Sequence, residues 1–239
     1  MPFEVIDLGL LNYRLAWDRQ LEYHAHVLEQ PHHPGYLLLV EHPPVVTIGR
    51  HPDSARHLLV SAAMLAQRGV ELVETDRGGD ITFHGPGQIV AYPIVALNYY
   101  HLNLHAYMRL LEEVVIQTLQ RYQVRGYRDP GATGVWVEPG ASANETPQDS
   151  PPPPSANLAK VCAMGVKLRK WITLHGLALN VTTDLAYFQL INPCGLSRPV
   201  TSLQQLLPQK CPQMTEVKTT LAEFFQTQLT EKLSQRSKD

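Results

Sequence analysis

Cysteine is scarce in this 239-residue chain, and the three that occur, Cys162, Cys194 and Cys211, have no CxxC spacing. An odd number of widely spaced cysteines argues against a disulfide framework and against a zinc site. The sequence also lacks a basic, apolar leader and any apolar run near the ~20 residues that span a bilayer. We therefore expect a protein of the reducing cytoplasm, neither exported nor held in a membrane.

A strong charge of either sign is also missing. Lysine and arginine number 20 and aspartate and glutamate 22, which gives a formal charge of -2 and a pI near 6.6. No overall field draws such a chain to nucleic acid or to anionic lipid. Hydrophobic residues make up 44% of the sequence, enough for a sizeable core. We expect a single domain over residues 1–239.

Apolar periodicity predicts both strands and helices. The clearest helix is expected over 105–122, with an apolar stripe that runs from Tyr107 to Tyr122, and others over 11–29, with Leu21, Ala25 and Leu28 on one face, and over 215–233. Ser61 can cap a short helix through Arg68, which Gly69 stops. Strands are expected at 5–8, 36–41, 45–48, 70–74, 81–83, 89–95 and 133–137. Together they predict an α/β (α+β) fold in which a mixed β-sheet is flanked by helices. The histidines His24, His26, His32 and His33 do not share a helix face, so a solvated surface is expected there rather than a metal site.

Glycine is concentrated in the stretch RGGDITFHGPGQIVAYPI, residues 77–94. Gly78 and Gly79 have no Cβ, so the main chain can press against a bound ligand. The same residues fit the turn of a β-hairpin between the strands expected at 70–74 and 81–83. The stretch alone favours neither the hairpin nor the ligand loop.

An unusual lysine opens the second informative stretch, LAKVCAMGVKLRKWITLHGLALNV, residues 158–181. Lys160 lies among small and apolar residues. A lysine at an edge strand can simply extend its ammonium group to solvent. In a cleft it can instead accept or donate a proton during a reaction.

The third stretch is Asn192-Pro193-Cys194-Gly195, which places a cysteine at the tip of a turn. Cys194 is either a small buried hydrophobe or a nucleophile. A nucleophilic thiol needs a neighbouring base or cation, because a free thiol is mostly protonated at neutral pH. Lys160 and His84 are the candidate neighbours.

A polar, proline-rich segment, EPGASANETPQDSPPPPSAN, occupies residues 138–157. It has no apolar periodicity and cannot bury enough surface to order itself. We interpret it as a flexible insertion in a strand connection. A linker between two domains is the alternative, but the chain after it has no independent set of core elements.

The motifs RGGDITFHGPGQ, AKVCAMGVKLRKW with LHGLALNV, and INPCG resemble those of the lipoyl(octanoyl) transferases, in the same order and over most of the chain. The resemblance implies the fold of the biotin and lipoate protein ligase catalytic domains. It also implies transfer of an octanoyl (lipoyl) group from acyl carrier protein to a lysine of a lipoyl domain through a cysteine thioester. That transfer is the first step of endogenous protein lipoylation.

Residue roles follow from the resemblance alone. Cys194 matches the nucleophile, and Lys160 matches the lysine that activates it and serves as acid and base. The implied substrate-binding residues are Arg77, Gly78, Gly79, Asp80, Ile81, Thr82, Phe83, His84, Ala163, Met164, Gly165, Gly176, Leu177 and Ala178. No metal or cofactor is implied beyond the phosphopantetheine of acyl carrier protein, which carries the substrate. The expected acceptors are the lipoyl domains of 2-oxoacid dehydrogenase complexes and the glycine cleavage H protein, and the expected state is a monomer.

The residues leave three rival functions open. An ATP-dependent lipoate or biotin protein ligase has the same fold and forms an adenylate without needing a cysteine at position 194. A Cys-His thioesterase hydrolyses the same donor, and a non-catalytic binder of lipoylated domains tolerates loss of Cys194. A thioester donor already stores the driving force for transfer, and the chain contains no GxxxxGK[ST] phosphate loop. We favour acyl transfer over the three rivals, because only transfer uses residues 77–84, Lys160 and Cys194 together.

Overall fold

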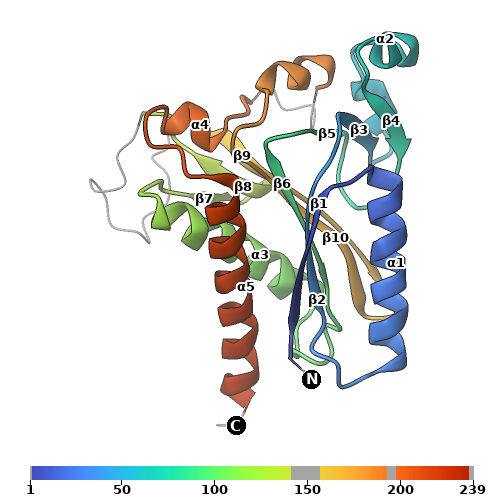
Figure 1. Cartoon of the computed structure of the whole chain (residues 1–239), viewed down its shortest axis with the longest axis vertical. Helices are drawn as coiled ribbons and strands as arrows, with labels where there is room; N and C mark the ends of the chain where they lie inside the picture. Colours follow the sequence, from blue (N-terminus) through green and yellow to red (C-terminus); the bar gives the residue numbers. More distant parts are fainter. Residues whose placement is uncertain (1, 141–156, 193–197, 237–239) are drawn as a thin grey trace.

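The computed structural model describes residues 2–140, 157–192 and 198–236, and its main feature is a seven-stranded sheet (Figure 1). The strand order is β1-β2-β6-β10-β9-β8-β7. Only β1 and β2 pair in parallel, and every other neighbouring pair is antiparallel. The strands are β1 (Glu4–Leu10), β2 (Tyr36–Glu41), β6 (Gln88–Ile94), β7 (Tyr127–Asp129), β8 (Ala132–Val137), β9 (Ala159–Arg169) and β10 (Ile172–Asn180).

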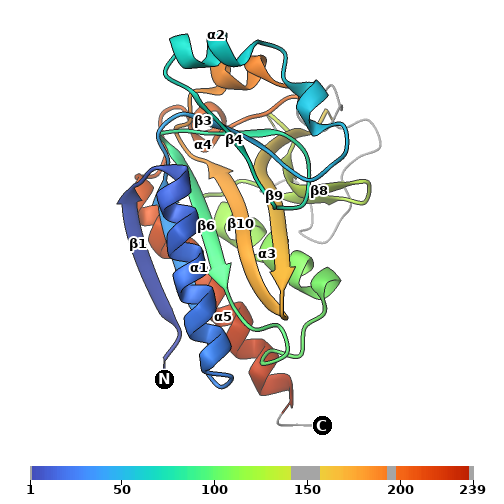
Figure 2. The same cartoon turned by 90° about the vertical axis from the view of Figure 1, so that its right-hand side faces the viewer.

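A second sheet has three strands in the order β4-β3-β5. They are β3 (Val45–Ile48), β4 (Glu71–Glu74) and β5 (Thr82–His84). In Figure 2 this small sheet lies beyond one end of β6 and β10. Strands β4 and β5 each pair with β3 and not with each other. The glycine-rich residues 75–81 therefore form a loop that crosses over β3, and the β-hairpin interpretation is wrong.

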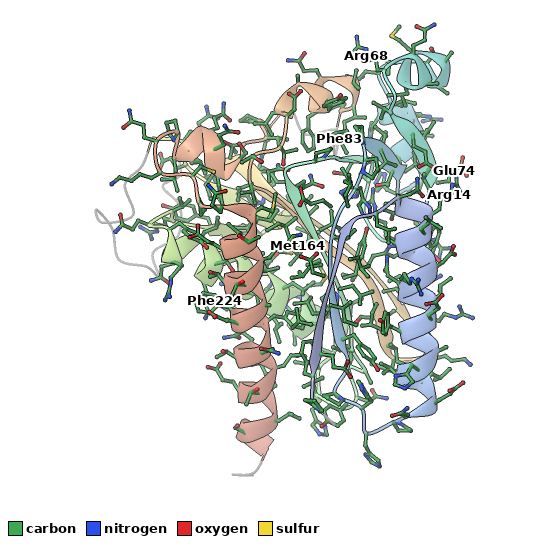
Figure 3. All side chains as sticks on the ribbon, in the orientation of Figure 1. Arg14, Arg68, Glu74, Phe83, Met164 and Phe224 are labelled. Atoms are coloured by element: carbon green, nitrogen blue, oxygen red, sulfur yellow. The ribbon has the colours of Figure 1, made fainter. Side chains whose placement is uncertain are left out.

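Helices cover both faces of the large sheet. Helix α1 (Tyr13–Glu29) packs on one face, and α3 (Leu104–Arg121) and α5 (Met214–Arg236) pack on the other (Figures 1 and 2). Figure 3 shows the same separation, with Arg14 on the α1 side and Phe224 on the α5 side. The shorter helices are α2 (Ala62–Gln67), α4 (Leu203–Leu206), and the 3₁₀ segments η1 (Ser54–His57) and η2 (Leu185–Leu190).

Strand β2 shows why the sheet needs both layers. Its residues are buried from Tyr36 to Val40, and alternate side chains enter different cores. Leu37 and Leu39 pack with α3 and α5, whereas Leu38 and Val40 pack with α1. A continuous apolar strand of this kind is stable only with cover on both faces. The structure confirms the predicted mixed sheet with flanking helices.

The inward face of α1 differs from the sequence expectation. Leu21, Ala25 and Leu28 are all exposed, Leu21 at 37% and Leu28 at 40%. The buried residues are Tyr13, Ala16, Gln20, His24 and Val27. Polar groups can face the sheet because it offers them partners. Gln20 Oε1 accepts the His175 N–H at 2.7 Å, and the His24 ring lies 3.1 Å from Arg169 O.

The histidines around the end of α1 are also less solvated than expected. His24 and His33 are buried, His26 is partly buried and only His32 is exposed. The expectation of a solvated surface is therefore wrong for the two buried rings. Among the described residues, no three His, Cys, Asp or Glu side chains come together as a metal site.

The other helix predictions agree with the structure. Ser61 caps α2 by accepting the Met64 N–H at 3.2 Å, and Gly69 follows with φ +67°. The predicted stripe of α3 is buried from Tyr107 to Leu119, and Val217, Leu221, Phe225 and Leu229 of α5 are buried against it. No helix in the described part of the chain is both long and apolar enough to cross a bilayer.

Candidate functional site

A cavity of about 390 Å³ lies where the small sheet meets β6, β9 and β10. Its wall also includes the first residue of α1, the β7–β8 turn and Lys160. The predicted site residues that line it are Arg77, Gly79, Asp80, Ile81, Thr82, His84, Lys160, Ala163, Met164, Gly165, Gly176, Leu177 and Ala178. The structure thus brings most residues of two distant motifs onto one cavity.

The pairing of β9 with β10 explains part of this convergence. Ala163 is opposite Ala178, Met164 opposite Leu177, and Gly165 opposite Gly176. Two segments that are separated in the chain therefore form one continuous patch of wall. Figure 3 shows Met164 near the middle of the molecule, between the helices of the two faces.

Two of the predicted substrate residues are not part of the cavity wall. Phe83 is 1% exposed and belongs to the core of the small sheet, where its ring stacks on Tyr187 with centroids 4.7 Å apart. Its strand neighbours Thr82 and His84 face the other way and line the cavity, as alternation requires. The Gly78 N–H donates to Val166 O at 2.9 Å, so this residue holds the loop to β9 from behind the wall.

Cys194 lies outside the described residues. Phe188 and Val200, which precede and follow it in the chain, both line the cavity. On the N-terminal side, Asn192 N–H donates to His57 O at 2.8 Å. On the C-terminal side, Lys160 N–H donates to Pro199 O at 2.8 Å, and Thr201 N–H donates back to Lys160 O at 2.9 Å. The flank that follows Cys194 is thus bonded to Lys160 in the cavity wall, and the flank that precedes it is bonded to His57, which does not line the cavity.

Arg77 anchors the glycine-rich loop from inside. It is 7% exposed, and its Nη2 group donates to Thr47 O at 2.8 Å and to Thr47 Oγ1 at 2.9 Å. Nη1 donates to Gly78 O at 3.2 Å. These donors hold the loop against β3, because a planar guanidinium group can satisfy several acceptors at fixed angles.

Glycines allow this loop to meet the large sheet at backbone distance. A Cβ on Gly165 would lie 2.5 Å from Gly78 O, and a Cβ on Gly176 would lie 2.1 Å from Ala91 O. Neither position has room for a side chain. We call Arg77, Gly165 and Gly176 the glycine wall, because close packing of these cavity residues on neighbouring backbone determines the shape of the cavity.

His84 is a neutral ring in this cavity. Burial lowers the pKa of His84 well below its ordinary value, and nearby His42 acts in the same direction. Its Nδ1–H donates to Gln88 Oε1 at 2.7 Å, and Gln88 Nε2 donates to Asn180 Oδ1 at 2.8 Å. Because Gln88 Oε1 can only accept, the proton is on Nδ1 and Nε2 keeps a lone pair.

Two buried phenols continue the wall behind His84. Burial raises the pKa of Tyr13 to about 12 and raises the pKa of Tyr92 well above the ordinary value, so both stay protonated. Tyr92 OH donates to His42 Nε2 at 2.8 Å, and His42 Nδ1–H donates to Leu11 O at 2.7 Å. The Tyr13 ring stacks on His84 with centroids 5.9 Å apart. This side of the cavity carries polar groups without a charge.

Asp76 ties the crossing loop to both long strands. His175 Nε2–H on β10 donates to Asp76 Oδ1 at 2.7 Å, and Lys167 on β9 forms an ion pair with Oδ2. The bond from His175, opposed by burial and helped by Lys167, lowers the pKa of Asp76 to about 2. Burial lowers the pKa of His175 as well, which leaves that ring neutral.

Asp80 connects the first motif to the third. Asp80 Oδ2 accepts the His57 Nδ1–H at 2.6 Å, and Oδ1 accepts the Ile81 N–H at 2.7 Å. His57 in turn bonds Asn192 through its backbone oxygen. The predicted substrate loop and the segment before Cys194 are therefore held together through one histidine.

Several wall residues were missed by sequence reasoning. They include Tyr13, His51, Gln88, Tyr92, Thr133 and Asn180. Gln88 and Asn180 are opposite each other at the ends of β6 and β10, and a polar residue at the end of an apolar strand is a signal that could have found them. Tyr13 and His51 carry no local signal, because only the packing of α1 and the small sheet brings them to the cavity.

Comparison with known proteins identifies the family. The pattern of the lipoyl protein ligase A/B catalytic domain matches residues 12–226. An octanoyltransferase of Gloeobacter violaceus is 43% identical over 85% of this chain and 81% of its own length. An octanoyltransferase of Christiangramia forsetii is 42% identical over 93% of this chain and 94% of its own length. The chain belongs to the octanoyltransferase family. The resemblance carried by its three motifs is confirmed.

Two solved structures have a fold similar to that of this chain. Lipoate-protein ligase A bound with ATP superposes with a TM-score of 0.67 at 18% identity, over 96% of this chain and 86% of that one. Biotin protein ligase from Aquifex aeolicus, in complex with biotin and ATP, gives 0.53 at 13% identity, over 95% and 71%. At these identities the likeness shows the fold alone, and it confirms the predicted ligase-type catalytic fold.

Proposed function

We propose that this octanoyltransferase works through an acyl-enzyme, with Cys194 as the nucleophile and Lys160 as the acid and base. The chain transfers an octanoyl group from acyl carrier protein to a lysine of a lipoyl domain. The residue assignment rests on one observation: a single cavity is lined by Lys160 and by residues of the segments 77–84, 163–165 and 176–178. Phe188 before Cys194 and Val200 after it line the same cavity.

In the first step the Cys194 thiolate attacks the thioester carbonyl of the carrier-borne octanoyl group. The new Cys194 thioester forms as the bond to the phosphopantetheine sulfur breaks, and that thiolate takes up a proton from Lys160. A thioester donor supplies the free energy, so no nucleotide is consumed. The glycine wall shapes the space for the acyl chain.

In the second step the amine of the acceptor lysine attacks the Cys194 thioester. An amide bond forms, the bond to Cys194 breaks, and Lys160 takes the proton that the amine loses. We propose the lipoyl domains of 2-oxoacid dehydrogenase complexes and the glycine cleavage H protein as acceptors. Both partners use the same site in turn, because the acyl group stays on the enzyme between the two steps.

The other two cysteines support this assignment. Cys162 is fully buried in β9, and burial raises the pKa of its thiol. Burial also raises the pKa of Cys211. Neither thiol is activated, since a nucleophilic cysteine requires a lowered pKa or an adjacent base.

Intact mass spectrometry tests the acyl-enzyme. The protein is incubated briefly with octanoyl-acyl carrier protein, and the modified peptide is mapped. We expect one octanoyl adduct on Cys194, its removal by a lipoyl domain, no adduct in Cys194→Ser, and an unchanged adduct in the control Cys211→Ser. Acyl transfer that persists in Cys194→Ser would reject the mechanism. Adenylate formation from ATP and octanoate would instead point to a ligase.

We further propose that the catalytic unit is a single domain spanning the chain, active as a monomer in the cytoplasm. The family pattern extends over residues 12–226, which supports one unit. Light scattering during size-exclusion chromatography measures the mass in solution. A dimer mass at assay concentration would overturn the monomer.

A further inference from the structure

Trp136 on β8 lies against two cations beside the cavity. The ring is 2% exposed, and Lys160 is its cross-strand partner on β9. Lys160 Nζ lies 4.6 Å from the ring centroid, and Arg198 Cζ lies 4.8 Å from it. Indole is the aromatic ring that attracts cations most strongly, and the attraction grows when water is excluded. Trp136 is not itself part of the cavity wall, so it can affect the cavity only through its neighbours.

The strand pairing holds both the indole and the lysine stem in place. Trp136 Nε1–H donates to Ala132 O at 3.2 Å, which fixes the plane of the ring. A Cβ on Gly134, at φ +119°, would lie 2.5 Å from Cys162 O and 3.5 Å from Lys160 Cε. The lysine stem therefore runs over Gly134 before its ammonium group reaches Trp136. A lysine has a long flexible stem, so such contacts restrict where its charge can lie.

Arg198 makes a second cation–π contact with the indole, and its ion pair with Asp129 balances its charge. Its guanidinium group pairs with the Asp129 carboxylate. Burial acts to raise the pKa of Asp129, but the bond from Arg198 and a backbone bond from Gly131 outweigh it and lower that pKa, so the carboxylate is ionised. Arg198 is also followed directly by Pro199, whose carbonyl accepts the Lys160 N–H. We call Lys160, Gly134, Trp136 and Arg198 the lysine end of the cavity.

We infer that Trp136 is a positioning residue for octanoyl transfer, whose indole, held by Arg198 and Asp129, keeps the Lys160 ammonium at one place at the edge of the cavity. The inference rests on the proposed role of Lys160 as acid and base. It predicts that Trp136 matters for the rate of proton transfer and not for donor binding, because a proton donor displaced by about 1 Å can lose two orders of magnitude in rate.

Steady-state kinetics of three variants tests the inference. Trp136→Leu removes the aromatic face, Trp136→Phe keeps a weaker one, and Tyr127→Leu is the matched control. Tyr127 is the other cross-strand partner of Trp136 and has Arg125 over its own ring at 4.9 Å, but it belongs to β7 and not to the cavity. We expect kcat to fall about 10- to 100-fold in Trp136→Leu, with the donor KM within about twofold, and Trp136→Phe to recover most of the loss. Tyr127→Leu should keep kcat within about twofold, because Tyr127 does not line the cavity and is not paired with Lys160.

A double-mutant cycle separates positioning from general loss of structure. In a Lys160→Ala background, Trp136→Leu should lower the residual rate by less than about twofold, since the group it positions is gone. The same factor in both backgrounds would overturn the inference. If Lys160→Ala itself transfers octanoyl at the wild-type rate, the proposed role of Lys160 fails instead.

Arg198→Gln keeps the inference testable if Trp136→Leu does not fold. It leaves the indole in place and removes the second cation over the ring together with its ion pair to Asp129. We expect kcat to fall about threefold to tenfold with donor KM unchanged, and Arg198→Lys to restore part of the rate. Equal kcat in Arg198→Gln and wild type would overturn the inference.

Discussion

At the glycine wall, backbone packs on backbone, whereas at the lysine end a long side chain lies on an aromatic ring. Gly165 and Gly176 sit where any Cβ would meet a carbonyl oxygen within 2.5 Å. Lys160 instead reaches its place through a stem that rests on Gly134 and Trp136. The comparison teaches that backbone packing in the sheet shapes this site, whereas the acid and base proposed for it is a single side chain that needs restraint. Mutations at the two places should therefore have different consequences.

Lys160→Ala should produce the largest effect and should separate chemistry from stability. We expect the rate of octanoyl transfer to fall on the order of 10³-fold, because the proposed mechanism uses this one group as both acid and base. The free energy of unfolding should change by no more than about 1 kcal/mol, the range of a single cation–π contact. Transfer assays and urea denaturation measure both quantities, with the exposed Lys210→Ala as the control. A full transfer rate in Lys160→Ala would contradict the comparison.

Gly176→Ala should mainly lower the stability of the fold, whereas Lys160→Ala should mainly lower the rate. The new methyl group would lie 2.1 Å from Ala91 O and 2.8 Å from Pro93 Cδ, so β10 must separate from β6. We expect the free energy of unfolding to fall by about 3 kcal/mol. Gly131→Ala is the matched control, because its Cβ would meet nothing closer than 3.5 Å. Equal stability of the two variants in urea denaturation would show that β6 and β10 can shift apart at little cost in free energy.

Acidification should weaken the side of the cavity that is built from buried histidines. Burial lowers the pKa of His42 from 6.5 to about 4. The folded protein keeps this ring neutral while the unfolded chain gains a proton, so the contribution of His42 is complete above pH 6.5 and is lost as the pH falls toward 4. The loss amounts to up to about 3 kcal/mol, and the lowered pKa values of His84 and His175 act in the same direction.

The variant His42→Asn isolates the part that belongs to one ring. It should be less stable than wild type near neutral pH, since Tyr92 loses its acceptor. Its stability should also fall less between about pH 6.5 and about pH 4 than that of wild type. Parallel stability curves, measured by urea denaturation across this range, would assign the acid sensitivity to other groups.

Arg77→Lys should weaken the glycine wall more mildly. One ammonium group cannot reproduce the forked bonds to both oxygens of Thr47. We expect a loss of about 2 kcal/mol in the free energy of unfolding. Arg14→Lys is the matched control, because that side chain is mostly exposed in its ion pair with Glu71 and should lose less than about 0.5 kcal/mol. A control variant as unstable as Arg77→Lys would show that burial of the guanidinium group contributes nothing.

The smallest effect on stability is expected on the outer face of α1, which belongs neither to the glycine wall nor to the lysine end of the cavity. Leu21→Ser should change the free energy of unfolding by about 0.5 kcal/mol or less, because Leu21 faces solvent. Val27→Ala on the inner face should cost about 1 kcal/mol or more. If thermal denaturation showed Leu21→Ser to be more destabilising than Val27→Ala, the face predicted from the sequence would be the buried one.

Local patterns predicted the elements well and their partners poorly. The stripe of α3 and the cap at Ser61 depend on residues a few positions apart, and both were found in the sequence. The hairpin interpretation failed because β3 lies between β4 and β5. The prediction of the buried face of α1 failed because two polar residues on that helix have hydrogen-bond partners on the sheet. Gln20 accepts from the backbone of His175, and the His24 ring bonds Arg169 O. Periodicity rules count such residues as outward-facing, since they cannot know what the sheet offers.

The candidate site divides in the same way. Lys160 and the glycines of the 77–94 stretch are unusual enough to be singled out in the sequence, whereas the 163–165 and 176–178 segments could be named only from the family resemblance of the three motifs. Phe83 was placed in the site with its neighbours, yet its ring enters the small sheet's core. Tyr13, His51 and Tyr92 could not be named, since they are distant in the chain and have no local feature in common. Trp136 has the appearance of an ordinary core residue in the sequence.

The sequence by itself determined the family, the order of the motifs, the strands and helices, and the residue types that acyl transfer needs. These properties depend on side-chain chemistry and short-range spacing. Only the tertiary structure decided that the 75–81 loop crosses β3, that Gly165 faces Gly176, and that Lys160 rests on Trp136. Each of these contacts joins residues through strand pairing or packing, and no local preference of the chain encodes which strands will be neighbours.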